Sequence, residues 1–238
     1  MDPRLIVALD TAERKQALDL VHKLLPAVGT FKVGLQLFTA QGPAIVGEIA
    51  AAGAGIFLDL KFHDIPNTVA GAIYSAARLP GVKFLTLHTA GGRRMMSAAA
   101  TACVETEEGE PHVSPDRPAL LGVTVLTSMA AEDLHQVGVP AALAAQVEHL
   151  ATLALAAGLD GLVCSPLEVA SLRRALGPAA ILVTPGIRAA GADPGDQRRV
   201  ATPAAALAAG ASHLVIGRPI TAASSPLDAA RRILAEIS

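Results

Sequence analysis

The sequence predicts an α/β protein, a (β/α)8 TIM barrel that forms a single domain over residues 1–238. Two observations predict this fold. Short apolar runs rich in β-branched residues alternate with longer Ala- and Leu-rich stretches, and about eight such pairs fit the length of the chain. A doubly wound open sheet is the alternative, but it usually has a glycine-rich turn after its first strand. Here the first apolar run continues into "ALDTAER" (8–14), which favours the barrel.

Eight apolar runs are the predicted strands, at 5–10, 31–35, 55–61, 84–89, 119–126, 161–165, 180–187 and 213–220. Helical spacing of Ala and Leu predicts helices between them, most clearly at 13–25 and 140–158. We expect Thr11 to cap the first of these helices, with Arg14 where a complete capping box has Glu. The acidic, Pro-rich stretch 104–119 is predicted to be an exposed loop and no domain boundary.

The composition excludes several classes of protein. With 52% hydrophobic and 17% charged residues the chain is too apolar to be disordered, and a net charge of −2 gives no general affinity for nucleic acid or anionic lipid. No segment is apolar over the length of a membrane span, and the start lacks a basic segment with a cleavage site, so we expect a soluble cytoplasmic protein. Cys103 and Cys164 form no CxxC pair and the histidines lack metal-ligand spacing, so neither a metal site nor a disulfide is predicted. Cys164 lies in an apolar run and is predicted to be a small buried side chain.

Polar side chains recur where the predicted strands end, which is where active sites of such barrels lie. They are Asp10, Lys32, Asp59, Lys61, His88, Thr127, Ser128, Arg188 and Arg218. Alternate residues of a strand share a face, so Asp59 and Lys61 should point together while Leu58, Leu60 and Phe62 point toward the helices. A structural ion-pair network is the plain alternative. Several ionisable groups at successive strand ends favour an active site instead.

The last third of the chain has the pattern of a phosphate site. "TPGIR" (184–188) ends the seventh predicted strand, "GDQRR" (195–199) follows, and "VIGRPI" (215–220) ends the eighth. The loops after these two strands commonly bind phosphate in such barrels. Gly217 would let the backbone approach the phosphate and Arg218 could bind it with two N–H groups, although a tight turn beside a surface arginine would show the same letters. The stretch 190–199 contains Gly and Pro and is predicted to be a mobile lid.

Together, "ALD", "FKVG", "DLKFHDIPNT", "GVTVLTSM", "TPGIR…GDQRR" and "VIGRPI" resemble the orotidine 5′-phosphate decarboxylase family, from about residue 5 to the final helix. "DLKFHDIPNT" (59–68) is the most specific of these motifs. The resemblance implies cofactor-free conversion of orotidine 5′-phosphate (OMP) to UMP and CO2 in de novo pyrimidine biosynthesis. The main departure from the family's pattern is the acidic loop after Cys103, which is remote from the motifs.

The resemblance also implies roles for individual residues. Lys32, Asp59, Lys61 and Asp64 correspond to a charged Lys–Asp–Lys–Asp array, in which Lys61 would donate the proton that replaces CO2 at C6. Asp64 and Thr68 would reach into the active site of a partner protomer, which implies a homodimer.

The remaining substrate contacts are also implied by the resemblance. Asp10 and Lys32 would bind the ribose hydroxyls. Ser128 and Gln197, with Thr127 beside them, would contact the pyrimidine and phosphate region. The phosphate itself would be held by Arg188, Gly217 and Arg218.

Two other functions stay open. Related sugar-phosphate lyases and decarboxylases also carry a D-x-K-x-x-D strand end but use Mg²⁺ with acidic ligands, so activity in EDTA would distinguish them. A non-catalytic protein that binds a phosphate ligand would need the arginines but not the Lys–Asp–Lys–Asp set. His63 is interpreted as a positioning or packing residue, and His88 either lines the site or is a hydrogen-bonded structural histidine.

Overall fold

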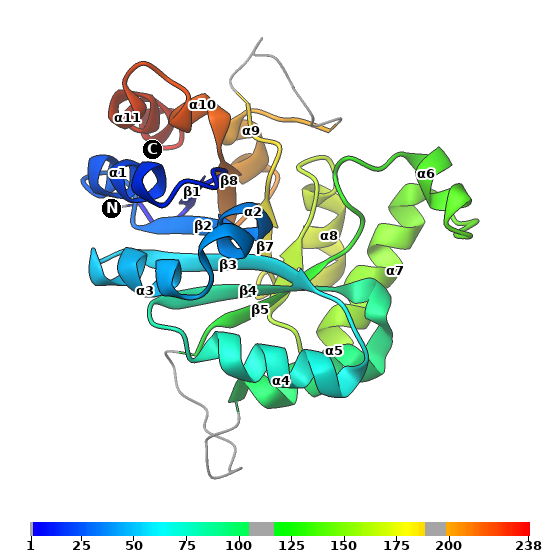
Figure 1. Cartoon of the computed structure of the whole chain (residues 1–238). Helices are drawn as coiled ribbons and strands as arrows, with labels where there is room; N and C mark the ends of the chain where they lie inside the picture. The colour runs from blue at the N-terminus through cyan, green and yellow to red at the C-terminus, as the bar shows by residue number, and fades with distance from the viewer. Residues whose placement is uncertain (1, 105–116, 189–198) are drawn as a thin grey trace.

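The computed structural model describes residues 2–104, 117–188 and 199–238. In this part of the chain, eight parallel strands close into a barrel in the order of the sequence, with helices around the outside (Figure 1). The strands are β1 (Leu5–Ala8), β2 (Thr30–Gly34), β3 (Gly55–Phe62), β4 (Val82–His88), β5 (Ala119–Val123), β6 (Gly161–Val163), β7 (Ile181–Thr184) and β8 (His213–Ile216). The helices are α1 (Arg14–Leu24), α2 (Leu35–Gln41), α3 (Ala44–Ala51), α4 (Pro66–Ala77), the 3-10 turn η1 (Thr89–Gly91), α5 (Gly92–Val104), α6 (Ala131–Gln136), α7 (Leu143–Ala156), α8 (Val169–Leu176), α9 (Pro203–Ala208), α10 (Arg218–Thr221) and α11 (Pro226–Glu236).

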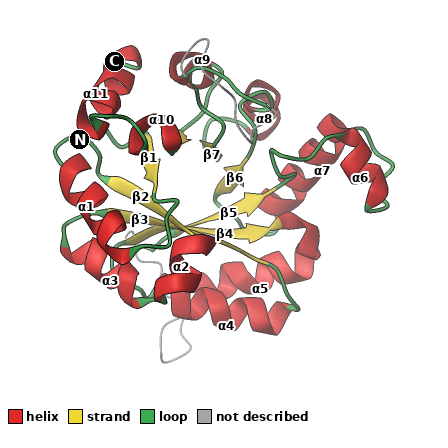
Figure 2. Ribbon diagram, turned by 45° about the horizontal axis from the view of Figure 1, so that its top comes forward, coloured by secondary structure: helices red, strands yellow, loops and turns green. Residues whose placement is uncertain are grey.

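The predicted fold class is confirmed, because β1 pairs with both β2 and β8 and the sheet therefore has no edge. Figure 2 shows the helices as a ring around the strands. The open-sheet alternative is thereby excluded. Of the predicted loop 104–119, residues 105–116 lie outside the described residues. Among the described helices, none is both long and apolar enough to cross a membrane.

The start of the first helix differs from the prediction. Helix α1 begins at Arg14, with Glu13 as its N-cap and no side chain capping it. The Thr11 hydroxyl instead accepts a hydrogen bond from the Glu13 amide (3.1 Å) and donates one to Gln16 Oε1 (2.5 Å). Thr11 therefore stabilises the turn that precedes the helix, with its hydroxyl bonded to residues on both sides of the helix start.

Alternation along the strands divides the apolar core into two layers. An inner cluster of Ile6, Ala8, Phe57, Leu121, Val183 and Val215 fills the barrel, while a larger outer cluster lies between strands and helices. Burial of one such side chain contributes about 1.5–3 kcal/mol. Leu58 is buried in the outer cluster, and Leu60 and Phe62 pack against it, as their alternation with Asp59 and Lys61 predicts. Cys164 is buried as predicted, and burial raises the pKa of its thiol to about 12.

Strand β3 is irregular where it reaches the mouth of the barrel. Leu58 pairs with Leu85 and Phe62 pairs with Leu87, so the register against β4 shifts between these two pairs. Lys61 has φ = 51°, the only positive φ of a non-glycine residue in the described part of the chain. Such a conformation costs about 1–3 kcal/mol and persists only where neighbouring groups hold it.

Candidate active site

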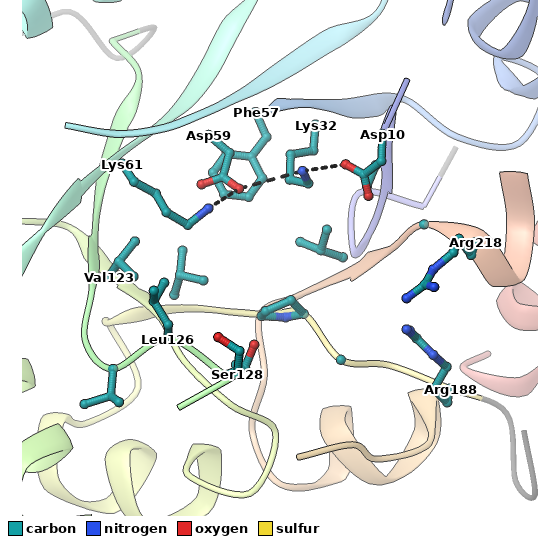
Figure 3. Close-up of a pocket in the computed structure, with 18 residues that line it drawn as sticks. Asp10, Lys32, Phe57, Asp59, Lys61, Val123, Leu126, Ser128, Arg188 and Arg218 are labelled. Carbon is teal, nitrogen blue, oxygen red and sulfur yellow. Dashed lines mark hydrogen bonds and ion pairs between the residues drawn. The ribbon is translucent and has the colours of Figure 1, made fainter. Parts of the chain in front are cut away.

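A cavity of about 350 Å³ opens at the carboxyl ends of the strands (Figure 3). The residues that line it come from all around the barrel: Ala8, Asp10, Lys32, Phe57, Asp59, Lys61, Val123, Val125, Leu126, Thr127, Ser128, Val163, Pro185, Gly186, Arg188, Val215, Gly217 and Arg218. Polar and apolar groups occupy different walls, which suits a ligand that has a charged end and a flat ring.

One wall is a row of alternating charges from the first three strands. Lys61 Nζ lies 2.7 Å from Asp59 Oδ2, and Lys32 Nζ lies 3.8 Å from the same oxygen. Lys32 Nζ also lies 3.1 Å from Asp10 Oδ1, so the order is Asp10, Lys32, Asp59, Lys61. These residues meet because Asp10 follows β1, Lys32 lies in β2, and Asp59 and Lys61 share a face of β3.

Asp59 is the most enclosed member of this row, with 6% of its surface exposed. Burial disfavours its charged form, but the ammonium groups of Lys61 and Lys32 and hydrogen bonds from Lys61 and Thr86 outweigh burial and lower the pKa of Asp59. The carboxylate is therefore ionised at neutral pH. It holds two cations at the centre of the site.

The opposite wall carries two arginines. Arg188 follows β7 and Arg218 follows β8, and their guanidinium groups point toward one another across the cavity mouth (Figure 3). Between Arg218 and the charged row lies Gly217, where an added Cβ would come 3.2 Å from Asp10 Oδ2. Glycine therefore keeps this wall open beside Asp10, and the arginines form an anion site at its rim.

A third wall is mostly apolar. Val123, Leu126 and Pro185 line it, with Thr127 and Ser128 among them. Phe57 lies below Asp59 on the same strand face, and its ring meets the ring of Phe84 edge to face at 5.8 Å. The apolar residues of this wall were not predicted from the sequence. Alternate residues of a strand share a face, so the position of Phe57 two residues before Asp59 could have predicted that Phe57 lines the bottom of the cavity.

Several residues named from the sequence lie elsewhere. Asp64 and Thr68 are exposed on the β3–α4 connection and the first turn of α4, and neither lines the cavity of its own chain. The Asp64 carboxylate accepts a hydrogen bond from the Ile65 amide at 2.6 Å. Gln197 and most of the predicted lid 190–199 lie outside the described residues.

The two histidines near β3 and β4 form a pair outside the cavity lining. The rings of His63 and His88 are 5.5 Å apart, His63 is exposed, and His88 is half-buried. Burial, followed by the neighbouring His63 and Lys61, lowers the pKa of His88. Neither residue lines the cavity.

A buried ion pair that was not predicted from the sequence connects the loops beside the cavity. Glu168 contacts Arg199, whose guanidinium also donates to the Leu126 carbonyl at 3.1 Å. Glu168 further accepts a hydrogen bond from the Ser165 amide at 2.9 Å. Burial raises the pKa of Glu168, although Arg199 and the Ser165 amide oppose this effect. The pair therefore ties the loops after β5 and β6 to the segment that precedes α9.

The structure describes residues 2–104, 117–188 and 199–238, and the acidic and metal-ligating side chains in these ranges are dispersed. No group of three or more His, Cys, Asp or Glu in these ranges could hold a metal ion. The carboxylates of Asp10 and Asp59 are each paired with a lysine ammonium. This donor set favours binding of an organic anion over binding of a divalent cation.

Comparisons with known proteins agree with this geometry. Residues 3–233 match the "Orotidine 5'-phosphate decarboxylase / HUMPS family". The chain is 52% identical to "Orotidine 5'-phosphate decarboxylase" of Moorella thermoacetica, covering 98% of this chain and 92% of the relative, and 54% identical to the protein of the same name from Opitutus terrae, covering 98% and 97%. A crystal structure of orotidine 5′-phosphate decarboxylase from Lactobacillus acidophilus superposes with a TM-score of 0.86 at 38% identity, covering all of both chains. The chain thus belongs to the orotidine 5′-phosphate decarboxylase family of carboxy-lyases, as its motifs predicted.

Proposed function

We propose that this protein is a cytoplasmic orotidine 5′-phosphate decarboxylase that converts OMP to UMP and CO2 in de novo pyrimidine biosynthesis, without a cofactor. One observation carries the proposal. A single cavity has Lys61 and Lys32 around the Asp59 carboxylate on one wall and Arg188 and Arg218 on another. A pyrimidine nucleotide presents its reacting carbon and its phosphate at opposite ends, which matches these two charged walls.

Lys61 is the proposed proton donor. When the bond between C6 and the carboxylate breaks, its electron pair stays on C6, where the ring cannot delocalise it well. The Lys61 ammonium stabilises this carbanion electrostatically and then transfers a proton to C6, leaving a neutral amine that solvent reprotonates. Asp59 would lie against the substrate carboxylate, so that their repulsion is relieved as neutral CO2 leaves.

The other residues are assigned to binding. Asp10 and Lys32, which are already paired, would hold the ribose hydroxyls. Thr127 and Ser128 would face the pyrimidine from the third wall, and Gln197 is assigned to the same region by the resemblance alone. The arginines at the rim, with the Gly217 backbone, would bind the phosphate.

A homodimer is part of the proposal. Asp64 and Thr68 lie outside the cavity of their own chain, which supports a role for them in the charged array of a second copy. The face that carries them also exposes Ile65, which is 67% exposed. Exposed apolar side chains beside exposed functional residues are typical of an interface between subunits.

The Mg²⁺-dependent sugar-phosphate lyases remain the second candidate. Lysines pair with both acidic side chains of the cavity, which favours the nucleotide enzyme. A protein that only binds phosphate ligands would have no use for the buried Asp59 and its two ammonium partners. Turnover of OMP that continues in EDTA would support the decarboxylase.

The test is an absorbance assay that follows OMP conversion to UMP, with and without EDTA. Lys61→Ala should abolish turnover because it removes the ammonium at C6, while its circular dichroism should match wild type. Lys83→Ala is the matched control, since Lys83 is an exposed lysine near the start of β4, at the end of the strand away from the cavity. Substantial decarboxylation by Lys61→Ala would remove Lys61 from its central role.

A further inference from the structure

One buried hydroxyl forms hydrogen bonds to both Asp59 and Lys61. Thr86 lies in the middle of β4 and is fully buried. Its Oγ1 donates a hydrogen bond to Asp59 Oδ1 at 3.0 Å and accepts one from the Lys61 backbone amide at 2.9 Å. The same side chain therefore holds the carboxylate of one residue and the backbone of the other.

The register of the sheet explains why Thr86 occupies this position. Between the pairs Leu58–Leu85 and Phe62–Leu87, strand β3 has three residues (59, 60 and 61) where β4 has only residue 86. Extra residues on one strand bend it locally and redirect its side chains. The Lys61 amide finds its acceptor in a side chain, and Lys61 takes the left-handed conformation noted above.

The two carboxylate oxygens of Asp59 interact with different partners. Thr86 occupies Oδ1, while Lys61 and Lys32 are both nearest to Oδ2. The rotation of a carboxylate about its last side-chain bond is soft, so a partner on one oxygen is needed to aim the other. Thr86 supplies that partner from a neighbouring strand.

We propose that Thr86 is a positioning residue for decarboxylation: its hydroxyl fixes the β3 bulge and the orientation of the Asp59 carboxylate, and thereby the place of the Lys61 ammonium in the cavity. The inference rests on the proposed function. Thr86 does not line the cavity, so its effect on substrate passes through Asp59 and Lys61.

The central experiment compares Thr86→Val, which keeps the shape and removes the hydroxyl, with Thr86→Ser, which keeps the hydroxyl. Because a small misplacement of a catalytic group can reduce the rate about a hundredfold, Thr86→Val should lower kcat for OMP about 10- to 100-fold. KM should stay within about threefold of wild type, since the arginines that bind the phosphate are untouched. Thr86→Ser should restore kcat to within about threefold of wild type.

A matched control separates positioning from general stability. Thr89 is also fully buried, and its hydroxyl donates to the Val123 carbonyl at 3.0 Å without touching the charged row. Thr89→Val loses one buried hydrogen bond, so its melting temperature should fall, while its kcat should stay within about threefold of wild type. In an Asp59→Asn background, Thr86→Val should have a smaller effect than in wild type, because coupled residues are not additive.

The outcomes distinguish the two proposals. If wild type does not convert OMP, the proposed function is wrong. If wild type converts OMP and Thr86→Val keeps its kcat, or if Thr86→Ser is as impaired as Thr86→Val, only the positioning role is wrong. If neither Thr86→Val nor Thr86→Ala folds while Thr89→Val does, Thr86 acts in folding and the inference is also overturned.

Discussion

The arginine wall gives a quantitative prediction about the phosphate of the substrate. Replacing Arg218 by Ala should lower kcat/KM for OMP but leave kcat/KM for orotidine, which lacks the phosphate, within about threefold of wild type. The phosphate is remote from C6, so its binding energy serves positioning of the substrate. The loss should therefore appear only when the phosphate is present.

The expected magnitude follows from the number of contacts that each guanidinium can offer. A hydrogen bond to a charged group contributes about 1.5–3 kcal/mol. At about 1.4 kcal/mol per tenfold change, Arg218→Ala should reduce kcat/KM for OMP about 10- to 150-fold. Arg188→Ala should fall in the same range, because Arg188 offers the same guanidinium donors at the rim of the cavity.

The assay measures initial rates of both substrates with wild type, the two arginine variants and a control. Arg231→Ala is the control, since Arg231 is an exposed arginine on α11 whose ion pair with Asp228 spans 3.8 Å outside the cavity. It should leave both rates unchanged. Equal losses on OMP and orotidine in Arg218→Ala would refute the assignment of this wall to the phosphate.

Three further predictions concern subunits, acid and the buried ion pair. Asp64→Ala and Lys61→Ala should each be inactive, but a refolded equal mixture should regain about one quarter of wild-type activity, because half the dimers then contain one intact site; no recovery would place Asp64 in its own subunit's site. The lowered pKa of Asp59 means that the folded state binds its proton less tightly than the unfolded state. The ionised Asp59 therefore stabilises the fold above its unfolded pKa of about 4, and this stabilisation is lost as the pH falls through the lower pKa of the folded state. In urea unfolding experiments, the free energy of unfolding should therefore decrease less between neutral and acid pH for Asp59→Asn than for wild type. Glu168→Gln should change the free energy of unfolding by no more than about 1 kcal/mol, because burial raises the pKa of Glu168, so its charged form is less favoured in the folded than in the unfolded state, and the Gln amide oxygen can still accept from the Ser165 amide. A shift of the urea midpoint worth about 3 kcal/mol would contradict this.

The sequence predicts the barrel and the charged row for a simple physical reason. A period of two along a strand and an alternation of strands with helices are local patterns, and closure of the sheet then brings Asp10, Lys32 and Asp59 together. The role of Thr86 could not be predicted in this way. In "FLTLHT" it reads as an ordinary strand residue, and only the shifted register against β3 places it opposite the bulge.

Contacts between loops could not be predicted from the sequence either. Glu168 and Arg199 lie 31 residues apart and on different connections, so their pairing depends on how two loops fold over the barrel. The capping of α1 was mispredicted because the exact start of a helix depends on the turn before it, here held by Thr11. Strand ends could be predicted to within a few residues, whereas side-chain partners across the sheet could not.

Closure of the barrel between its first and last strands has a consequence for synthesis of the protein. Leu5 pairs with Leu214, and Gly217 packs beside Asp10, so one side of the binding cavity joins residues that lie far apart in the sequence. A nascent chain released before about residue 218 would carry Lys61 and Asp59 but no complete cleft for a nucleotide. The binding cavity is therefore complete only once β8 has been synthesised and has paired with β1.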